Sequence, residues 1–370
     1  MLNKIKILHL IPRFEVGGAE MLVWHYSRLM NGADFEIAVG SCVEDGQFRA
    51  EFEKLGVKVF VGSRVKMKGR RGVWRELKKF VDQWQPDIIH THLMASDFFG
   101  YLIKKRSRGK IRPALGGVNW ISTQHNVEFN TSLPRRLLWR FILPKADQVI
   151  AVAQKVQKYC LDHFGVQAEK LATILNGIDL QNWLAVDNSH LFTGDRLRIA
   201  TIGRLENQKG HVYLLRALEQ LKEINWSWDI FGDGSKRSNL EAAARRYGID
   251  DRLVWHGVTD QVYNHLNNID LMIQPSLWEG LSLVVMEAMA AGKAILTTKI
   301  AGEELIDNGH TGMLVAEGDV GAIKDAIQYL YSRPDVGRGL GAKAHAHAKE
   351  NFSIEKSIER IGDLYLSFRA

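Results

Sequence analysis

Short apolar runs alternate with segments of helical periodicity along the whole chain. The first half contains six runs of up to eight residues that are rich in Ile and Val: KIKILHLI, FEIAVGS, VKVFVG, DIIHTH, NWISTQH and DQVIAVA. Between these runs, apolar residues recur at helical spacing over residues 19–30, 47–55, 73–84 and 96–105. Near-continuous apolar strands separated by helices are typical of a parallel sheet covered by helices on both faces.

The same rhythm starts again after residue 195. It predicts strands at 196–203, 226–232, 253–257, 271–276 and 294–298, and helices at 211–223, 236–247, 260–267 and 283–291. We therefore expect an α/β protein of two doubly wound, Rossmann-like domains that face each other across a cleft. The first domain is predicted at 1–174, with a C-terminal helix near 353–370 packing back on it, and the second at 175–352.

Length and composition exclude several classes of protein. With 370 residues, 46% of them apolar and 25% charged, the chain suits two globular domains and not a disordered or fibrous protein. No run of 18 residues lacks charge, and the N-terminal apolar run has no cleavage site for a signal peptide. Cys42 and Cys160 have no metal-ligand spacing and indicate a reducing compartment. We expect a cytoplasmic protein.

Charge is distributed unevenly. Residues 1–172 hold 28 Lys and Arg against 16 Asp and Glu, whereas residues 173–370 hold 21 against 26. The basic half concentrates its cations in three segments, 64–80, 104–112 and 134–145. The third segment interleaves Arg with Leu, Trp, Phe and Ile, a composition that suits docking on an anionic membrane surface. No base-reading module accompanies the charge, so we expect no nucleic-acid partner.

Two strand-to-helix loops combine glycine or cations with the start of a helix. Gly17 and Gly18 follow the first strand, where a missing side chain lets backbone amides approach an anion. Arg204 and Lys209 follow the strand at 196–203 and precede a helix. Two cations beside the amides of a helix N-terminus make a site for a diphosphate.

A third loop carries carboxylates. Glu279 follows the strand at 271–276, and Gly280, Leu281 and Ser282 offer amides at the N-terminus of the next helix. Glu287 lies inside that apolar helix, where an ionised side chain is costly to bury without a partner. A carboxylate can accept hydrogen bonds from both hydroxyls of a sugar diol.

Histidines follow two strands of the first half. His125 comes directly after the strand in NWISTQH and is a candidate for a residue that points into the cleft. His90 and His92 could suggest a metal, but no third ligand is nearby, and we expect none. The chain also lacks an Asp-x-Asp pair, with which many sugar-nucleotide enzymes hold divalent ions.

Taken together, these motifs resemble the retaining glycosyltransferases of family 4, which have the GT-B architecture. The most specific matches are Arg204 and Lys209 in GRL…KG, and Glu279 and Glu287 at E-x7-E spacing. Further matches along the chain are the IP…GGAE opening, HTH at 90–92, ILNGID at 174–179, WHG at 255–257 and HTGMLVAEGD at 310–319. The resemblance spans nearly the whole chain and is closest to enzymes that build cell-envelope polysaccharides, lipopolysaccharide among them.

The resemblance implies a role for each candidate residue. Arg204 and Lys209 would bind the donor diphosphate, and Glu287 the ribose of the nucleotide. Glu279 would approach the donor sugar, together with the loop amides of Gly280, Leu281 and Ser282. Gly17 and Gly18 would lie near the phosphate and the acceptor, and His125 would contact the sugar near the reacting carbon.

The resemblance also implies the reaction. A sugar would pass from a nucleotide-diphosphate donor, most simply a UDP-sugar, to a hydroxyl of a glycan or lipid-linked acceptor, with retained anomeric configuration and without a metal or other cofactor. Association with the inner face of the cytoplasmic membrane would fit the basic first half. Alternatives on the same fold are a sugar-nucleotide epimerase, a phosphorylase or a non-catalytic nucleotide-sugar-binding protein.

Overall fold

The structure, a computed structural model, describes residues 4–63, 69–110, 117–127, 132–259 and 262–369. Its internal contacts divide the chain into two compact units. Unit 1 comprises Met1–Gly177 and Ile354–Ala370, and unit 2 comprises Ile178–Ser353. The sequence pattern predicts the division after residue 174 and the return of the chain to the first domain near residue 353.

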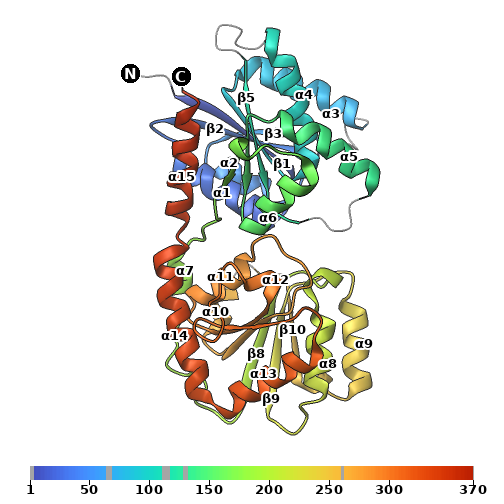
Figure 1. The fold of residues 1–370 in the computed structure, drawn as a ribbon, viewed down its shortest axis with the longest axis vertical. Helices are drawn as coiled ribbons and strands as arrows, with labels where there is room; N and C mark the ends of the chain where they lie inside the picture. Colours follow the sequence, from blue (N-terminus) through green and yellow to red (C-terminus); the bar gives the residue numbers. More distant parts are fainter. Residues whose placement is uncertain (1–3, 64–68, 111–116, 128–131, 260–261, 370) are drawn as a thin grey trace. The chain divides into compact units, whose positions relative to one another are not determined.

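Unit 1 is built on a seven-stranded sheet in which every described pairing is parallel (Figure 1). The strand order is β3-β2-β1-β4-β5-β6-β7. The strands are β1 (Ile5–Arg13), β2 (Phe35–Glu44), β3 (Lys58–Val61), β4 (Ile88–His92), β5 (Asn119–Gln124), β6 (Gln148–Ala151) and β7 (Leu171–Thr173). The order reverses beside β1, which makes the sheet doubly wound.

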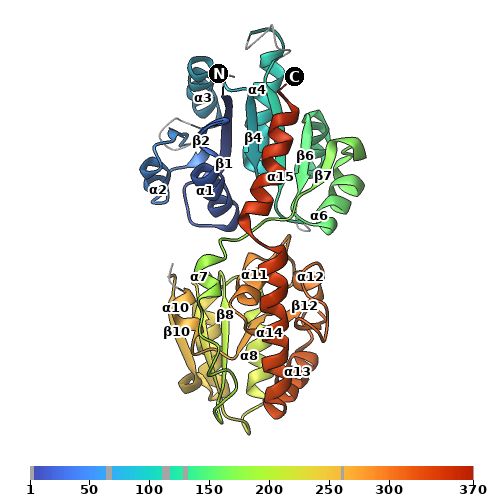
Figure 2. The same cartoon turned by 90° about the vertical axis from the view of Figure 1, so that its left-hand side faces the viewer.

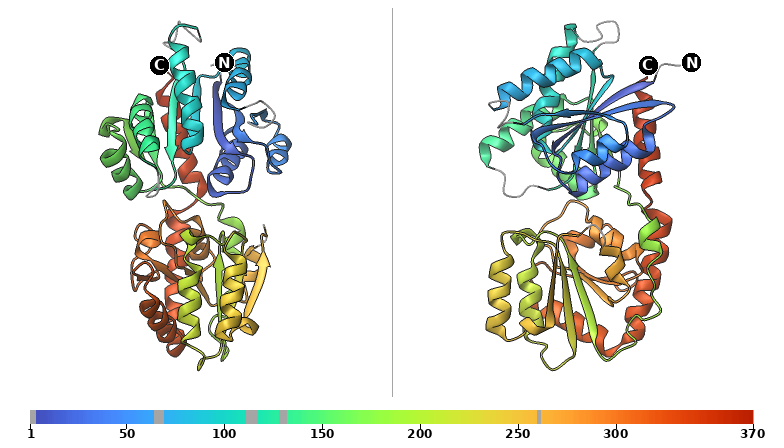
Figure 3. Two further views of the ribbon diagram at one scale, coloured as in Figure 1. Left: turned by 90° about the vertical axis from the view of Figure 1, so that its right-hand side faces the viewer. Right: turned by 180° about the vertical axis from the view of Figure 1, so that it is seen from behind.

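Helices cover both faces of this sheet. They are α1 (Gly18–Met30), α2 (Arg49–Lys54), α3 (Arg70–Trp84), α4 (Met94–Lys110), α5 (Leu133–Ile142), α6 (Gln154–Tyr159) and α15 (Ile354–Ser367). The C-terminal helix α15 packs against α1 and crosses the face of the sheet in front of β4 (Figure 2). α4 covers the opposite face, over β4 and β5 (Figure 3, left).

The burial of side chains on both faces of the central strands explains why helices cover both faces of the sheet. Ile7, Ile88, Ile121 and Ile150 are fully or almost fully buried, one in each of β1, β4, β5 and β6. Successive side chains of a strand point to opposite faces, so both faces of such strands must be covered. In β4, His90 contacts α15 through Tyr365. The next residue, Thr91, bonds Asp97 of α4 on the other face.

Unit 2 repeats the design with a six-stranded parallel sheet in the order β10-β9-β8-β11-β12-β13. The strands are β8 (Leu197–Ile202), β9 (Trp226–Phe231), β10 (Leu253–Gly257), β11 (Leu271–Gln274), β12 (Ala294–Thr298) and β13 (Met313–Val315). The helices are α7 (Gln181–Leu184), α8 (His211–Glu219), α9 (Arg237–Tyr247), α10 (Val262–Leu266), α11 (Leu283–Ala290), α12 (Lys299–Gly302), α13 (Val320–Ser332) and α14 (Pro334–Asn351). α8 and α9 line one face of the sheet, and α11 and α14 the other (Figure 3, right).

The predicted fold class, two Rossmann-like α/β domains, is confirmed. Each strand predicted from an apolar run is present, although the helix predicted at 211–223 ends at Glu219. The helix predicted at 260–267 corresponds to α10, and residues 260–261 lie outside the described residues. Two further strands, β7 and β13, were not predicted.

Candidate active site

Two loops of unit 2 carry residues that the sequence analysis singled out. Arg204 and Lys209 follow β8, and Glu279 follows β11. β8 and β11 are neighbours in the sheet, so their carboxyl ends lie side by side. This edge is where open α/β sheets bind ligands. The structure therefore brings both predicted cations and the first predicted carboxylate to one edge.

Lys209 and Glu279 form an ion pair in the loops of β8 and β11. Lys209 Nζ lies 2.5 Å from Glu279 Oε1, and the two side chains are only 14% and 10% exposed. Ser276 Oγ donates to the same carboxylate oxygen at 3.0 Å. The Gln274 amide oxygen can accept from Lys209 Nζ at 3.2 Å while its nitrogen donates to the Ile202 carbonyl. These contacts hold the ammonium at the edge of the sheet, whereas an exposed lysine head would move freely in solvent.

Arg204 differs from Lys209 in being exposed. Its Nη2 lies 3.5 Å from Gln208 Oε1, and it has no salt bridge to a carboxylate of the described residues. Gln208 in turn donates from Nε2 to the Trp278 carbonyl at 3.0 Å. A guanidinium that is not committed to a protein carboxylate is available to a phosphate, which it can bind through two parallel N–H donors.

Gly210 allows the two loops to pack closely. Its φ of 66° is in the left-handed region, and a Cβ at this position would lie 2.0 Å from the Pro275 carbonyl oxygen. Nearby, the Leu277 amide donates to the Gln208 carbonyl at 2.8 Å. Only glycine suits such a contact without displacing the backbone. The position of Lys209 beside Glu279 therefore depends on the glycine that follows it.

The start of α11 has the features of an anion site. Ser282 occupies the N-cap position but makes no capping bond with its side chain. Its Oγ is buried and has no hydrogen-bond partner among the described residues. Gly280 and Leu281, which precede it, are also buried. The first amides of a helix lack intrahelical acceptors and carry partial positive charge, so an anion is favoured there.

Glu287 lies one turn into α11, in an otherwise apolar helix. Desolvation raises the pKa of its carboxyl to about 7, although the positive charge of Lys209 acts in the opposite direction. The neighbouring residues Val285, Met286 and Ala288 are buried. A carboxyl group whose pKa is close to neutral can gain or lose its charge when a ligand with hydroxyl donors binds.

In unit 1, the predicted glycines lie between β1 and α1. Gly17 is the N-cap residue of α1 and Gly18 its first residue, and α1 has no side-chain cap. The Glu20 carboxylate lies beside Gly17, since a Cβ on this glycine would be 2.5 Å from Glu20 Oε2. The strand-to-helix position is as expected, and a contact of these glycines with phosphate stays a prediction.

His125 follows β5 and belongs to a chain of three imidazoles. Its Nε2 lies 3.1 Å from Nδ1 of His92, and Nε2 of His92 lies 3.0 Å from Nδ1 of His9. Burial lowers the pKa of His125 to about 4 and that of His9 to about 3, so both rings are neutral at pH 7. A neutral imidazole has one donor and one acceptor. The tautomer of each ring therefore fixes that of the next.

Neighbouring strands explain how these histidines meet. His9 of β1 is paired in register with His90 of β4, and His92 with Thr123 of β5. The expectation that His90 and His92 have no third ligand nearby is wrong, because nitrogens of His9, His90 and His92 lie within 4.8 Å of one another. Such a cluster could hold a metal ion.

The nitrogens of His90 already have partners in the protein. Nδ1 lies 2.5 Å from the Tyr365 hydroxyl and Nε2 lies 2.7 Å from Thr123 Oγ1. Sequence reasoning missed His9 because more than 80 residues separate it from His90, and only the register of β1 and β4 could have revealed it. That no metal is needed stays a prediction.

Family models match both halves of the chain. Residues 16–182 match the model described as Glycosyltransferase Family 4, and residues 196–333 match that described as Glycosyl transferases group 1. The chain belongs to the group 1 glycosyltransferases. With the two Rossmann-like units described above, this glycosyltransferase has the GT-B fold that the sequence motifs implied.

Similar proteins agree with this assignment. The glycosyltransferase is 24% identical to the UDP-Gal:alpha-D-GlcNAc-diphosphoundecaprenol alpha-1,3-galactosyltransferase of Escherichia coli, over 98% of this chain and 97% of that enzyme. Among solved structures, Anabaena Alr3699/HepE in complex with UDP-glucose aligns with a TM-score of 0.85 and 20% identity, covering 98% of this chain and 100% of HepE. A glycosyltransferase of Rickettsia africae aligns with a TM-score of 0.81 and 19% identity over 99% of both chains.

Proposed function

We propose that this glycosyltransferase moves a sugar from a UDP-sugar to a hydroxyl of a glycan or lipid-linked acceptor, with retained anomeric configuration and without a metal ion. The observation that carries the proposal is the Lys209–Glu279 pair beside Arg204, at the edge where the uncapped N-terminus of α11 begins. A similar fold is known in complex with UDP-glucose in HepE, and the Escherichia coli relative is named for a UDP-galactose donor.

Lys209 and Arg204 hold the donor diphosphate in this proposal. When the anomeric C–O bond breaks, negative charge grows on the diphosphate and positive charge on the sugar ring. The two cations and the amides of Gly280, Leu281 and Ser282 stabilise the leaving diphosphate, which is what a divalent ion does in other sugar-nucleotide enzymes. Loss of one such preorganised charge slows a reaction by about 10²–10³-fold.

The remaining candidates bind sugar. The Glu287 carboxylate accepts hydrogen bonds from the ribose hydroxyls, and Glu279, held in place by its ion pair with Lys209, contacts hydroxyls of the donor sugar. His125 contacts the sugar near the reacting carbon. The acceptor hydroxyl attacks from the face that the diphosphate leaves, so the configuration is retained.

We place the acceptor side in unit 1 and propose contact with the cytoplasmic face of an anionic membrane. None of the described helices is both long and apolar enough to cross a bilayer. Helix α5 instead exposes apolar side chains, Leu133 at 67%, Leu137 at 58% and Phe141 at 57%, between exposed arginines. Of the three basic segments, residues 64–68 and 111–112 lie outside the described residues. Salt-sensitive flotation with anionic vesicles tests this contact, and equal recovery with neutral vesicles would contradict it.

Turnover tests the reaction itself. The purified enzyme is incubated with a panel of UDP-sugars and a membrane extract that contains lipid-linked glycans, in the presence of EDTA. We expect UDP release that depends on the extract, and a product whose anomeric configuration by NMR matches that of the donor. Release of UDP that needs an added metal, or an inverted product, would contradict the proposal. Conversion of the UDP-sugar without any acceptor would favour an epimerase.

A further inference from the structure

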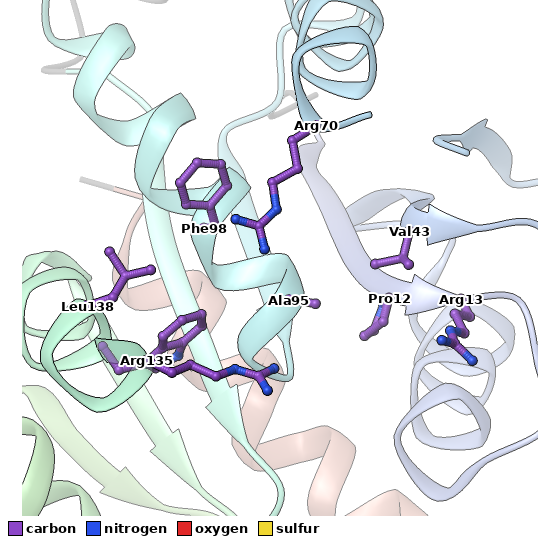
Figure 4. Close-up of a pocket in the computed structure, with 9 residues that line it drawn as sticks. Pro12, Arg13, Val43, Arg70, Ala95, Phe98, Arg135 and Leu138 are labelled. Atoms are coloured by element: carbon purple, nitrogen blue, oxygen red, sulfur yellow. The ribbon is translucent and has the colours of Figure 1, made fainter. Parts of the chain in front are cut away.

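A pocket lies within unit 1, at the carboxyl edge of its sheet. The pocket has a volume of about 310 Å³. Its lining comes from the ends of β1 and β2 and from helices α3, α4 and α5, and includes Arg13, Arg70, Phe98, Arg135, Leu138 and Trp139 (Figure 4). None of these residues was singled out individually by the sequence motifs, and none belongs to the donor-binding loops of unit 2.

The pocket combines three guanidinium groups with apolar walls. The Arg70 guanidinium lies 5.5 Å from the centre of the Phe98 ring. Figure 4 shows Arg70 and Arg135 extending from two sides toward the start of α4 near Ala95. Neither arginine forms a salt bridge with a carboxylate of the described residues. Their charges are therefore free to meet an anionic ligand.

Arg13, the third arginine of the pocket, differs from the other two because it lies close to carboxylates. It lies 3.7 Å from Glu15 and 3.5 Å from Glu44, and these side chains are about half exposed. Exposed ion pairs of this kind contribute little energy and can rearrange. Because these carboxylates offset the charge of Arg13, the uncompensated positive charge of the pocket comes from Arg70 and Arg135.

A buried carboxylate fixes the wall formed by α5. Trp139 Nε1 donates to Asp97 Oδ2 at 3.4 Å, and Asp97 also accepts from Thr91 and Ser122 at 2.6 Å and from Gln124 at 2.9 Å. This network ties α5 to the first turn of α4 and to strands β4 and β5. The pocket is therefore a preformed feature of the unit.

The pocket adjoins His125 through the start of α4. Ala95 and Phe98 line the pocket, whereas Leu93 and Met94 line a smaller hollow together with His125. Leu93 has a φ of 65°, a left-handed conformation that is costly for a leucine and that connects β4 directly to α4. Consecutive residues at the start of α4 therefore line both the pocket and the hollow of His125, which we propose to lie near the reacting carbon.

Helix α5 extends the apolar wall outward. Leu138, 37% exposed, lies at the pocket, and Leu137 and Phe141 are exposed on the same helix. An apolar chain that leaves the pocket along α5 would cover these side chains. Burial of these apolar surfaces would favour a ligand that carries a hydrocarbon chain.

We propose that this pocket binds the diphosphate of a polyprenyl-diphosphate-linked acceptor, with Arg70 and Arg135 on the phosphate oxygens and the first isoprene units against Leu138 and the exposed face of α5. The assignment rests on the proposed function, since it names the acceptor of that reaction. A neutral sugar would leave two guanidinium groups without an anion, and a free phosphate would leave the apolar wall uncovered. A prenyl diphosphate satisfies both.

Calorimetry with farnesyl diphosphate tests the assignment on the full chain. We expect binding to the wild type and at least about tenfold weaker binding to Arg70→Gln and to Arg135→Gln, as for loss of a charge-assisted hydrogen bond. Arg140→Gln, on the same helix but outside the pocket, is the matched control and should bind as the wild type does. UDP affinity should be unchanged in all three variants.

Measurements with inorganic pyrophosphate and with anionic phospholipid vesicles distinguish a prenyl diphosphate from other anionic ligands. Inorganic pyrophosphate should bind more weakly than farnesyl diphosphate, because it lacks the apolar chain. The proposal is overturned if farnesyl diphosphate does not bind, if both pocket variants bind it as the wild type does, or if binding to anionic phospholipid vesicles depends equally on Arg70 and Arg135. Arginine-dependent binding in a protein that fails to bind UDP would instead support the pocket and refute the donor site.

Discussion

At the scale of single residues, Glu287 offers the sharpest test of the donor site. Its carboxyl has a pKa raised to about 7 by burial, and Lys209 supplies the nearby positive charge. The ribose hydroxyls are donors, and they bond an ionised carboxylate more strongly than a protonated one. Binding of the nucleotide is therefore linked to loss of the proton from Glu287.

We expect the affinity for UDP-glucose to rise about tenfold between pH 6 and pH 8, because the ionised fraction of a group with pKa about 7 rises by that factor. UDP-glucose is the better probe for this experiment than UDP, because the diphosphate of UDP-glucose does not titrate between pH 6 and pH 8. The Glu287→Gln variant should bind weakly at both values and lose the slope, whereas Glu241→Gln, on α9, should behave as the wild type. A slope that persists in Glu287→Gln would refute the ribose assignment.

His92 is predicted to act as a positioning residue for His125. Its Nδ1 faces His125, and its other nitrogen faces His9. Replacement by Leu removes the hydrogen bond that orients the His125 ring, so kcat should fall about tenfold or more while KM for the donor changes little. His92→Asn retains a polar atom at the Nδ1 position and should recover part of kcat. Equal losses in the two variants would point to a structural role alone.

The sequence pattern indicated Arg204, Lys209 and Glu279 as candidate residues because each follows an apolar strand and precedes a helix. Lys209 and Glu279 are 70 residues apart in the chain. They meet because β8 and β11 are neighbours, which the order of a doubly wound sheet implies. The arginine pocket could not be found in this way. Arg70 and Arg135 belong to two of the basic segments noted in the sequence, but nothing in the sequence indicates that they meet Arg13. Only the packing of α3, α4 and α5 on the sheet brings them together.

At the scale of elements, strong apolar periodicity predicted most strands and helices. Three-residue edge strands such as β7 (Leu171–Thr173) and β13 (Met313–Val315) were missed because so short a run has no detectable period. The turn between α11 and β12 contains a lysine whose burial the apolar pattern of the sequence did not predict. Lys293 is fully buried, and its Nζ has no hydrogen-bond partner among the described residues.

Lys293 should lower the stability of the fold at neutral pH. Desolvation lowers its pKa to about 8, although Asp270 acts in the opposite direction. Below pH 8 the amine is charged in both the folded and the unfolded state, and the folded state carries the cost of burying this charge. The cost disappears as the pH rises from 8 toward 10.5, the ordinary pKa of a lysine. We therefore expect Lys293→Met to have a free energy of unfolding, measured by urea denaturation, that is about 1–4 kcal/mol higher than that of the wild type at pH 7. This gain in stability should shrink toward pH 10.

The exposed Lys349→Met of α14 is the matched control, and its stability should follow that of the wild type at each pH. A Lys293→Met variant that is less stable than the wild type at pH 7, or whose difference from it does not change with pH, would contradict a cost of burying the charged amine.

At the scale of the whole molecule, the same construction occurs twice, and we propose a separate task for each unit. Unit 2 presents carboxylates and cations that suit a nucleotide-sugar donor, and unit 1 presents histidines and a basic pocket that suit an anionic acceptor. The uneven distribution of charge along the chain, +7 overall with the excess in the first half, is consistent with this division. Both units and their parallel sheets were predictable from the strand–helix rhythm, whereas the partners of each side chain required the fold.

We propose that the loops of β8 and β11 bind a nucleoside diphosphate through protein cations alone, and calorimetric titration with UDP in the presence of EDTA measures this binding. We expect micromolar affinity that added Mg²⁺ does not strengthen, and about tenfold or more weakening in Lys209→Met, where a charged donor to phosphate is lost. Binding that disappears in EDTA and returns with Mg²⁺, or equal affinity of Lys209→Met and the wild type, would contradict it.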